Sequence, residues 1–169
     1  MVIPLLTGID SEYETLHVLS DYLAAVGAAL GVGEESCTVD LDTPLSAYVA
    51  MEGRLARHPD RDTALVWDER HGWSFAMETH SGEDLLVLAY LGCELVPAPA
   101  RIAAFVARIH ALGGPVPVST PPDLHSDRDS LLGRVSRYRR DRWGRATAQL
   151  SHAGRQVESD QNDLFRTTA

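Results

Sequence analysis

The sequence contains no lysine, and all 15 basic residues of the 169-residue chain are arginine. This absence excludes three kinds of chemistry. A Walker-A phosphate loop, a Schiff base to pyridoxal phosphate and a lysine general base each require an ε-amino group, which a guanidinium cannot replace. The enzyme classes that depend on those groups are therefore excluded.

Cysteine is scarce as well. Cys37 and Cys93 lie far apart, and neither has a second cysteine nearby, so the sequence builds no zinc knuckle and no CxxC redox pair. We expect both to be reduced residues of the core. No complete cofactor motif is present either, and we expect neither a metal nor a cofactor.

Long apolar runs are missing. No run approaches the roughly 20 residues that a transmembrane helix needs. Residues 1–6 are apolar, but they lack the basic residues of a signal peptide and are soon followed by Asp10 and Glu12. These features predict a cytoplasmic protein without a membrane partner.

The formal charge of −9 is unevenly distributed. Residues 1–112 contain 6 arginines and 17 acidic residues, a net charge of −11, whereas residues 113–169 contain 9 and 7, a net charge of +2. A stretch rich in proline and glycine begins at Gly113 and cannot continue a helix. The sequence predicts an acidic domain over 1–112, a linker over 113–126, an arginine-rich helix over 127–150 and a disordered tail over 151–169.

A helix is predicted near each end of the acidic domain. Ser11 is a potential N-cap and Gly31 a stop signal for the first, whose apolar residues recur every three or four positions. Its predicted buried stripe is Leu16, Leu19, Leu23, Val26 and Leu30. The second helix follows Pro97 and Pro99. Its predicted stripe is Ile102, Phe105, Val106, Ile109 and Leu112.

Five strands are predicted between these helices, over residues 37–42, 45–52, 63–67, 73–77 and 85–91. The third and fourth form a hairpin in which Gly72 supplies a left-handed residue, with Trp73, Phe75 and Met77 on one face. The last run shows no alternation, which is typical of a central strand covered on both faces. Short sequential connections favour an antiparallel five-stranded meander flanked by the two helices, an α+β fold.

The hairpin sequence Trp67-Asp68-Glu69-Arg70-His71-Gly72-Trp73 and the acidic turn at Glu83-Asp84 carry a resemblance to known proteins. They resemble a family of uncharacterised actinobacterial proteins with a Trp-Asp-x-x-x-Gly-Trp hairpin, over roughly residues 13–112. The resemblance implies an actinobacterial source and a compact domain of unknown function, and it assigns no catalytic residue. The helix, meander, helix order is also similar to that of secretion-chaperone-like α+β domains, which bind other proteins.

Histidine and carboxylate side chains gather at the hairpin and the turn after it: Asp68, Glu69, His71, Glu78, His80, Glu83 and Asp84. Glu78 and His80 are two residues apart and would share one face of a strand. With Asp68 or His71 as a third ligand, they are candidates for a His/carboxylate metal or catalytic site. The alternative is a solvated end of the sheet with polar turn residues.

Arginines crowd the segment after the linker, interleaved with Tyr138 and Trp143. They are Arg134, Arg137, Arg139, Arg140, Arg142 and Arg145. A helix capped by Asp127 or Asp129 would carry them, with Leu131, Leu132, Val135, Tyr138 and Arg142 on one side. Guanidinium groups and aromatic rings suit phosphates and unpaired bases, but also an acidic protein surface or the chain's own acidic domain. Self-association into a homodimer is a further possibility.

Three functions remain open on the sequence. The preferred one is a non-enzymatic adaptor or chaperone-like protein that binds a protein partner through the acidic domain and the arginine-rich tail. The second is a nucleic-acid-associated regulator that binds through those arginines. The third is a small enzyme that uses Asp68, Glu78 and His80 in a cleft of the sheet.

Overall fold

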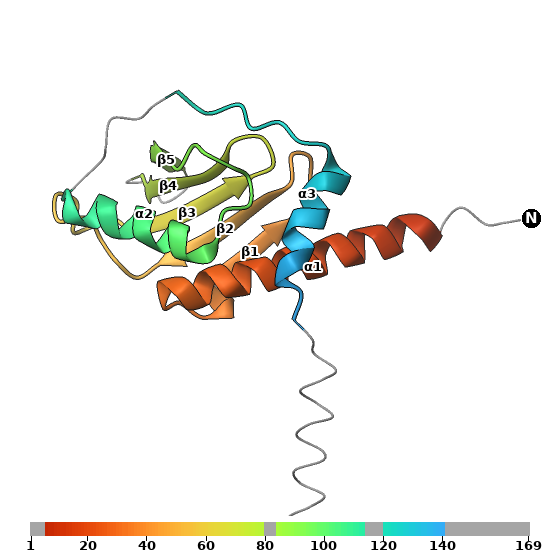
Figure 1. Cartoon of the computed structure of the whole chain (residues 1–169). Helices are drawn as coiled ribbons and strands as arrows, with labels where there is room; N and C mark the ends of the chain where they lie inside the picture. The colour runs from red at the N-terminus through yellow and green to blue at the C-terminus, as the bar shows by residue number, and fades with distance from the viewer. Residues whose placement is uncertain (1–5, 80–83, 114–119, 141–169) are drawn as a thin grey trace, which may run out of the picture. The chain divides into compact units, whose positions relative to one another are not determined.

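A long helix, a five-stranded sheet and two shorter α-helices follow one another along the described chain (Figure 1). A computed structural model describes residues 6–79, 84–113 and 120–140. The element order confirms the predicted α+β meander. The chain divides into a compact unit, Met1–Arg139, and a second unit, Arg140–Ala169.

Helix α1 spans Leu6–Leu30 and begins before its predicted cap. Ser11 is instead inside the helix, where its carbonyl oxygen accepts a hydrogen bond from Thr15 Oγ1 at 2.8 Å. The predicted stop is confirmed, because Gly31 has a φ of +77°, a conformation that glycine adopts without steric cost. Of the predicted stripe, Leu19, Leu23 and Val26 are buried, whereas Leu16 is exposed.

The sheet is a meander in which each strand pairs with its neighbour in sequence. Its strands are β1 (Cys37–Asp40), β2 (Ser46–Met51), β3 (Thr63–Asp68), β4 (Gly72–Glu78) and β5 (Leu85–Tyr90). All four pairings are antiparallel. The β3–β4 hairpin is as predicted, with Gly72 at a φ of +67° after the turn.

Helix α2 spans Pro99–Ala111 and starts with proline in its first turn, where a missing N–H costs no helical hydrogen bond. Its buried residues are Ile102, Val106 and Ile109. The predicted stripe is wrong at its end: Leu112 is the C-cap and is 58% exposed.

Helices α1 and α2 cover one face of the sheet (Figure 1). From α1, the Tyr22 hydroxyl accepts a hydrogen bond from Trp73 Nε1, and from α2, the His110 ring packs edge-on against Phe75. The predicted shared face is confirmed, since Trp73, Phe75 and Met77 are all buried in this core. Hydrophobic burial against the helices therefore sets the register of the central strands.

Strand β5 lies at an edge of the sheet, so its predicted central position is wrong. Its first two residues, Leu85 and Leu86, are 40% and 50% exposed. Only Leu88 and Ala89 within the strand are buried. The unbroken apolar run therefore does not reflect cover on both faces.

Helix α3 spans Arg128–Val135 and continues as a 3₁₀ turn over Ser136–Tyr138. Leu131 and Val135 are buried in the same core as the sheet, so the compact unit runs past the predicted boundary at residue 112. The predicted helix over 127–150 is too long, because the helical residues end at Tyr138 and neither Arg139 nor Arg140 is helical. Its residues 141–150, the predicted tail over 151–169 and the linker residues 114–119 lie outside the described residues.

The two cysteines differ in exposure. Cys93 is exposed, so its prediction as a core residue is wrong. Cys37 is half-buried, with its Sγ 3.8 Å from the carbonyl oxygen of Gly33.

The sequence has no apolar run long enough for a transmembrane helix, and the structure agrees: each helix in the described part of the chain is too short or too polar to cross a bilayer.

Candidate functional site

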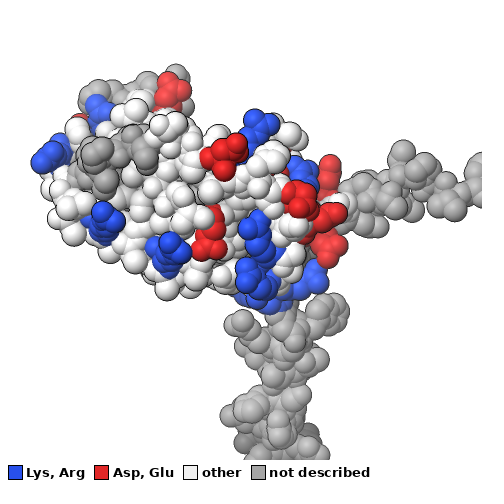
Figure 2. Space-filling view, turned by 45° about the horizontal axis from the view of Figure 1, so that its top comes forward, with Lys and Arg blue, Asp and Glu red and all other residues white. Residues whose placement is uncertain are grey.

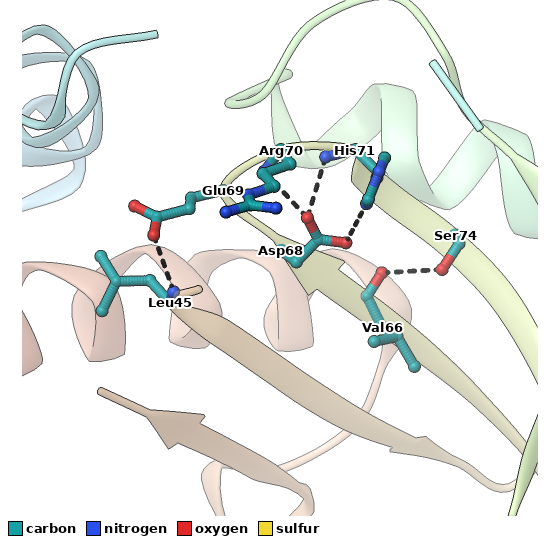
Figure 3. Close-up of polar contacts among 7 residues, drawn as sticks. All are labelled: Leu45, Val66, Asp68, Glu69, Arg70, His71 and Ser74. Atoms are coloured by element: carbon teal, nitrogen blue, oxygen red, sulfur yellow. Dashed lines mark hydrogen bonds and ion pairs between the residues drawn. The ribbon is translucent and has the colours of Figure 1, made fainter. Parts of the chain in front are cut away.

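The carboxylate of Asp68 is occupied by the hairpin turn itself (Figure 3). Its Oδ1 accepts hydrogen bonds from the backbone N–H groups of Arg70, at 2.8 Å, and His71, at 2.9 Å. Its Oδ2 lies 3.0 Å from His71 Nδ1. A carboxylate that accepts from its own turn in this way stabilises the turn, and Asp68 therefore has a structural role here.

The structure does not bring Asp68 and Glu78 together. Asp68 pairs with Gly72 at the start of β4, and Glu78 is the last residue of that strand. Six residues at about 3.4 Å each place the two carboxyl-bearing positions ~20 Å apart. They cannot bind one metal ion or one reacting group, whose ligands lie roughly 2–3 Å from it.

Glu78 has a different neighbour. Its Oε1 lies 3.5 Å from the hydroxyl of Tyr48 on β2, at the limit of a hydrogen bond. Partial burial, assisted by the negative charge of Glu78, raises the pKa of Tyr48. The third candidate, His80, lies outside the described residues together with Glu83. Within residues 6–79, 84–113 and 120–140, no group of three His, Cys, Asp or Glu side chains is placed to hold a metal ion.

The hairpin turn instead contacts the segment that leads into α3. Glu69 Oε1 accepts the backbone N–H of Leu45 at 3.0 Å, and both Glu69 oxygens lie 3.2–3.3 Å from Arg128 Nη2. The backbone N–H of Leu124 donates to the carbonyl oxygen of Arg70 at 2.9 Å. The polar turn that the sequence suggested as a metal site therefore contacts residues about 55 positions later in the chain.

Apolar contacts fasten α3 to α1 beside this turn. Leu131 and Val135 are 1% and 0% exposed. The ring of Tyr138 lies 4.9 Å from that of Tyr22, centroid to centroid. Asp127 is the N-cap, as predicted: its side chain accepts the backbone N–H of Ser130 at 2.8 Å, and this bond lowers the pKa of Asp127. The predicted apolar side of this helix thus faces the chain's own domain.

The predicted partner-binding arginines contact residues of the chain itself wherever they are described. Arg134 donates to Ser126 Oγ at 2.7 Å, Arg137 donates to the carbonyl oxygen of Arg134 at 3.1 Å, and Arg139 pairs with Glu14 at 2.8 Å. Figure 2 shows arginines and acidic residues intermingled on the visible face. Arg140 is the last described residue and also has an interaction. Arg142, Trp143 and Arg145 lie outside the described residues.

An open cleft of about 750 Å³ lies between the loop after β5 and the C-terminal segment. Its lining residues include Cys93, Glu94 and Asp123 as well as His125 and Arg134. Opposite charges thus occur together within one cleft. The sequence did not predict this cleft, because the two segments that line it lie some 30 residues apart in the chain.

The second face of the sheet, opposite α1 and α2, carries uncharged residues at its centre. Antiparallel partners share a face, and the pairings align two cross-strand rows over β2, β3, β4 and β5. One row is Tyr48, Val66, Ser74 and Tyr90, and the other is Ala50, Ala64, Ala76 and Val87. We call these eight residues the open face. Its larger residues, Tyr48, Val66, Val87 and Tyr90, are half-buried, whereas the smaller Ala64, Ala76 and Ser74 are buried.

Comparison with known proteins adds a family without a known activity. A model described as a family of unknown function (DUF6292) matches residues 22–108, from the middle of α1 to the last turn of α2. The match contains all five strands and ends before α3. No curated protein and no solved structure matches the chain.

Proposed function

Because the chain belongs to this family of unknown function, which assigns no activity, we propose from its surfaces that it is a protein-binding domain with an adaptor or chaperone-like role. The open face carries the proposal. An antiparallel sheet with helices on one side normally turns charged or strongly polar side chains outward on the other. Here eight neighbouring positions over four strands carry no charge.

The composition of the open face supports a protein partner. Two tyrosines and two valines are its larger residues, and three alanines lie side by side across β2, β3 and β4. Ser74 donates a hydrogen bond to the carbonyl oxygen of Val66. Aromatic residues are enriched and charged residues depleted at the centres of protein interfaces, so the two tyrosines and the absence of charge support a partner, whereas alanine and serine are depleted there and do not. The charged positions lie at the ends of the strands, at Asp68 and Glu78, where an interface has its polar rim.

The charge distribution is less favourable to nucleic acid. Residues 1–139 contain 10 arginines and 20 acidic residues, a net charge of −10, which repels phosphates. Arg128 and Arg139 also face carboxylates of their own domain. Binding of nucleic acid through the arginine-rich segment remains a prediction, as do the cytoplasmic location and the actinobacterial origin. The arginines concerned are Arg134, Arg137, Arg139, Arg140, Arg142 and Arg145.

The test replaces one open-face residue by an acid. Val66→Glu places a charge at the centre of the open face, and Ala104→Glu, on the exposed side of α2, adds the same charge elsewhere. The wild type and both variants, each shown to be folded by circular dichroism, serve as bait in lysate of the source organism, with and without nuclease treatment. We expect a stoichiometric partner that the wild type and Ala104→Glu retain and Val66→Glu loses.

Two outcomes would overturn the proposal. In the first, Val66→Glu captures the same proteins as the wild type. In the second, capture depends on the nucleic acid and disappears with nuclease treatment, which would favour the regulator instead. For that regulator, affinity for an oligonucleotide should fall steeply with salt concentration and with replacement of the arginines by alanine.

A further inference from the structure

Strand β5 is an edge strand with an unusual exposure pattern. Leu85 pairs with Glu78 and therefore lies on the same side of the sheet as the open face. Leu86 pairs with Met77 and lies on the side that the helices cover. Both are exposed, at 40% and 50%. A helix or loop resting on one face of the sheet would cover only one of them. An additional strand in the plane of the sheet would cover both.

The strand has neither a charged residue nor a proline to keep its outer edge from pairing. Proteins usually protect an exposed edge with charged side chains or proline. Residues Leu85–Tyr90, Leu-Leu-Val-Leu-Ala-Tyr, include neither. Within the described residues, β5 pairs with β4 alone. The register shift at Phe75/Ala76 leaves Leu88 of β5 without a partner, a bulge that bends the strand at that point, whereas Leu85 and Leu86, which precede the bulge, are exposed.

We infer that β5 pairs with β5 of a second copy of this chain, antiparallel and about a two-fold axis. In such a pair each residue faces a residue of the same strand, so a strand with charges of one sign would bring like charges together. Strand β5 has no charge at any position, so in the register that pairs Leu85 with Tyr90 of the second copy, uncharged side chains face uncharged side chains. A second copy of β5 is therefore sufficient to pair with the outer edge of this strand.

The charge of the rest of the molecule determines how this dimer depends on salt. Each compact unit has a net charge of −10, so two copies repel each other at a distance, whereas the paired strands are uncharged. Salt screens the repulsion and leaves the contact itself intact. The dimer should therefore become tighter as the salt concentration rises, the opposite of binding to phosphates.

The strand contact is small, and this determines the concentration range. One strand pair buries less than the roughly 1,200–2,000 Å² of a stable specific interface. We therefore expect a weak dimer, formed at about 10–200 μM protein. Sedimentation velocity of the full chain over that range, at low and high salt, measures it directly.

Two charge-matched variants test the location of the contact. Leu86→Glu places a carboxylate on the edge, and Leu112→Glu replaces a leucine that is equally exposed but lies at the end of α2. We expect Leu86→Glu to raise the dimer dissociation constant at least about 100-fold, because a symmetric dimer contains the change twice. Leu112→Glu and the conservative Leu86→Val should leave it within about 3-fold, as changes outside or compatible with the contact.

Several results would overturn this inference: a wild type that is monomeric throughout the range, a Leu86→Glu variant that still dimerises, or a dimer that weakens with added salt. Amide hydrogen exchange provides a second readout, since β5 amides should become more protected as protein concentration rises.

The open-face variant Val66→Glu should retain the dimer. A dimer lost in Val66→Glu would mean that copies pair face to face, whereas a retained dimer that captures no partner would count against the proposed function alone.

Discussion

The hydroxyl of Tyr22 joins α1 to the sheet and to the loop before α2, and its removal tests the packing on which the whole arrangement depends. Trp73 Nε1 donates to this hydroxyl at 3.1 Å, and the hydroxyl donates to the carbonyl oxygen of Pro97 at 2.8 Å. Burial also raises the pKa of Tyr22, so the group remains a neutral donor. Tyr22→Phe keeps the ring against Tyr138 but leaves a buried N–H and a buried C=O without their partner.

Each orphaned group costs about 1–3 kcal/mol, and partial relaxation of the neighbours brings the sum to about 2–4 kcal/mol. For a chain of this length the melting temperature should fall by roughly 4–15 °C. Urea unfolding of the full chain, followed by circular dichroism, measures the free energy. Tyr13→Phe is the matched control, because Tyr13 is 69% exposed and its change should stay within about 0.5 kcal/mol. If the two variants were equally stable, the buried hydrogen bonds of Tyr22 would be refuted.

Three further predictions concern the C-terminal segment and the cysteines. Leu131→Ala should lower the free energy of unfolding by about 2–5 kcal/mol, because it leaves a cavity beneath α3; a loss under about 0.5 kcal/mol in urea unfolding would contradict that packing. The lowered pKa of Asp127 means that its capping contribution is present above the ordinary value of 3.8 and is lost as the pH falls through the lower folded value. The Ser130 amide should therefore exchange faster in acid, relative to the intrinsic rate, and Asp127→Ala should abolish this dependence. Burial, with the charges of two nearby glutamates, raises the pKa of the Cys37 thiol, so at about pH 8 a thiol reagent should react slowly with Cys37 and fast with the exposed Cys93. Cys93→Ser should leave only the slow phase, and a single common rate in the wild type would contradict the difference.

Local patterns were sufficient for most of the fold. The recurrence of Leu19, Leu23 and Val26 predicts the buried side of α1, and the alternation of Trp73 and Phe75 predicts the buried side of β4. Gly72 after a short polar turn predicts the hairpin. These signals are local because burial of one side of an element imposes the period of that element on its sequence.

The position of β5 shows where such patterns fail. An apolar run without alternation is compatible with cover on both faces and also with a position at the edge of a sheet. Residues Leu85–Tyr90 have the composition of the first and the position of the second. The predicted meander order itself places the last strand at an edge, so chain topology was the better guide than hydropathy.

The candidate site depended on contacts that no local pattern contains. Counting charges separates the arginine-rich segment from the acidic domain, but the position of α3 depends on two buried side chains, Leu131 and Val135. Their spacing of four predicts an apolar side without saying what it meets. Likewise the carboxylate of Glu69 is a potential metal ligand by its chemistry, and only the fold shows that it pairs with Arg128.

The open face and the edge of β5 are physically connected, which links the two proposals. The row Tyr48, Val66, Ser74 and Tyr90 ends on β5, so pairing of β5 with a second copy would continue the row across a sheet with twice the five strands. A partner that spans both copies would bind the dimer more tightly than the monomer. By thermodynamic reciprocity it would strengthen the dimer by the same factor, so the dimer dissociation constant should fall when the partner is added. A partner that binds one copy alone would leave that constant unchanged, which makes the measured coupling a direct test of whether the two surfaces act as one.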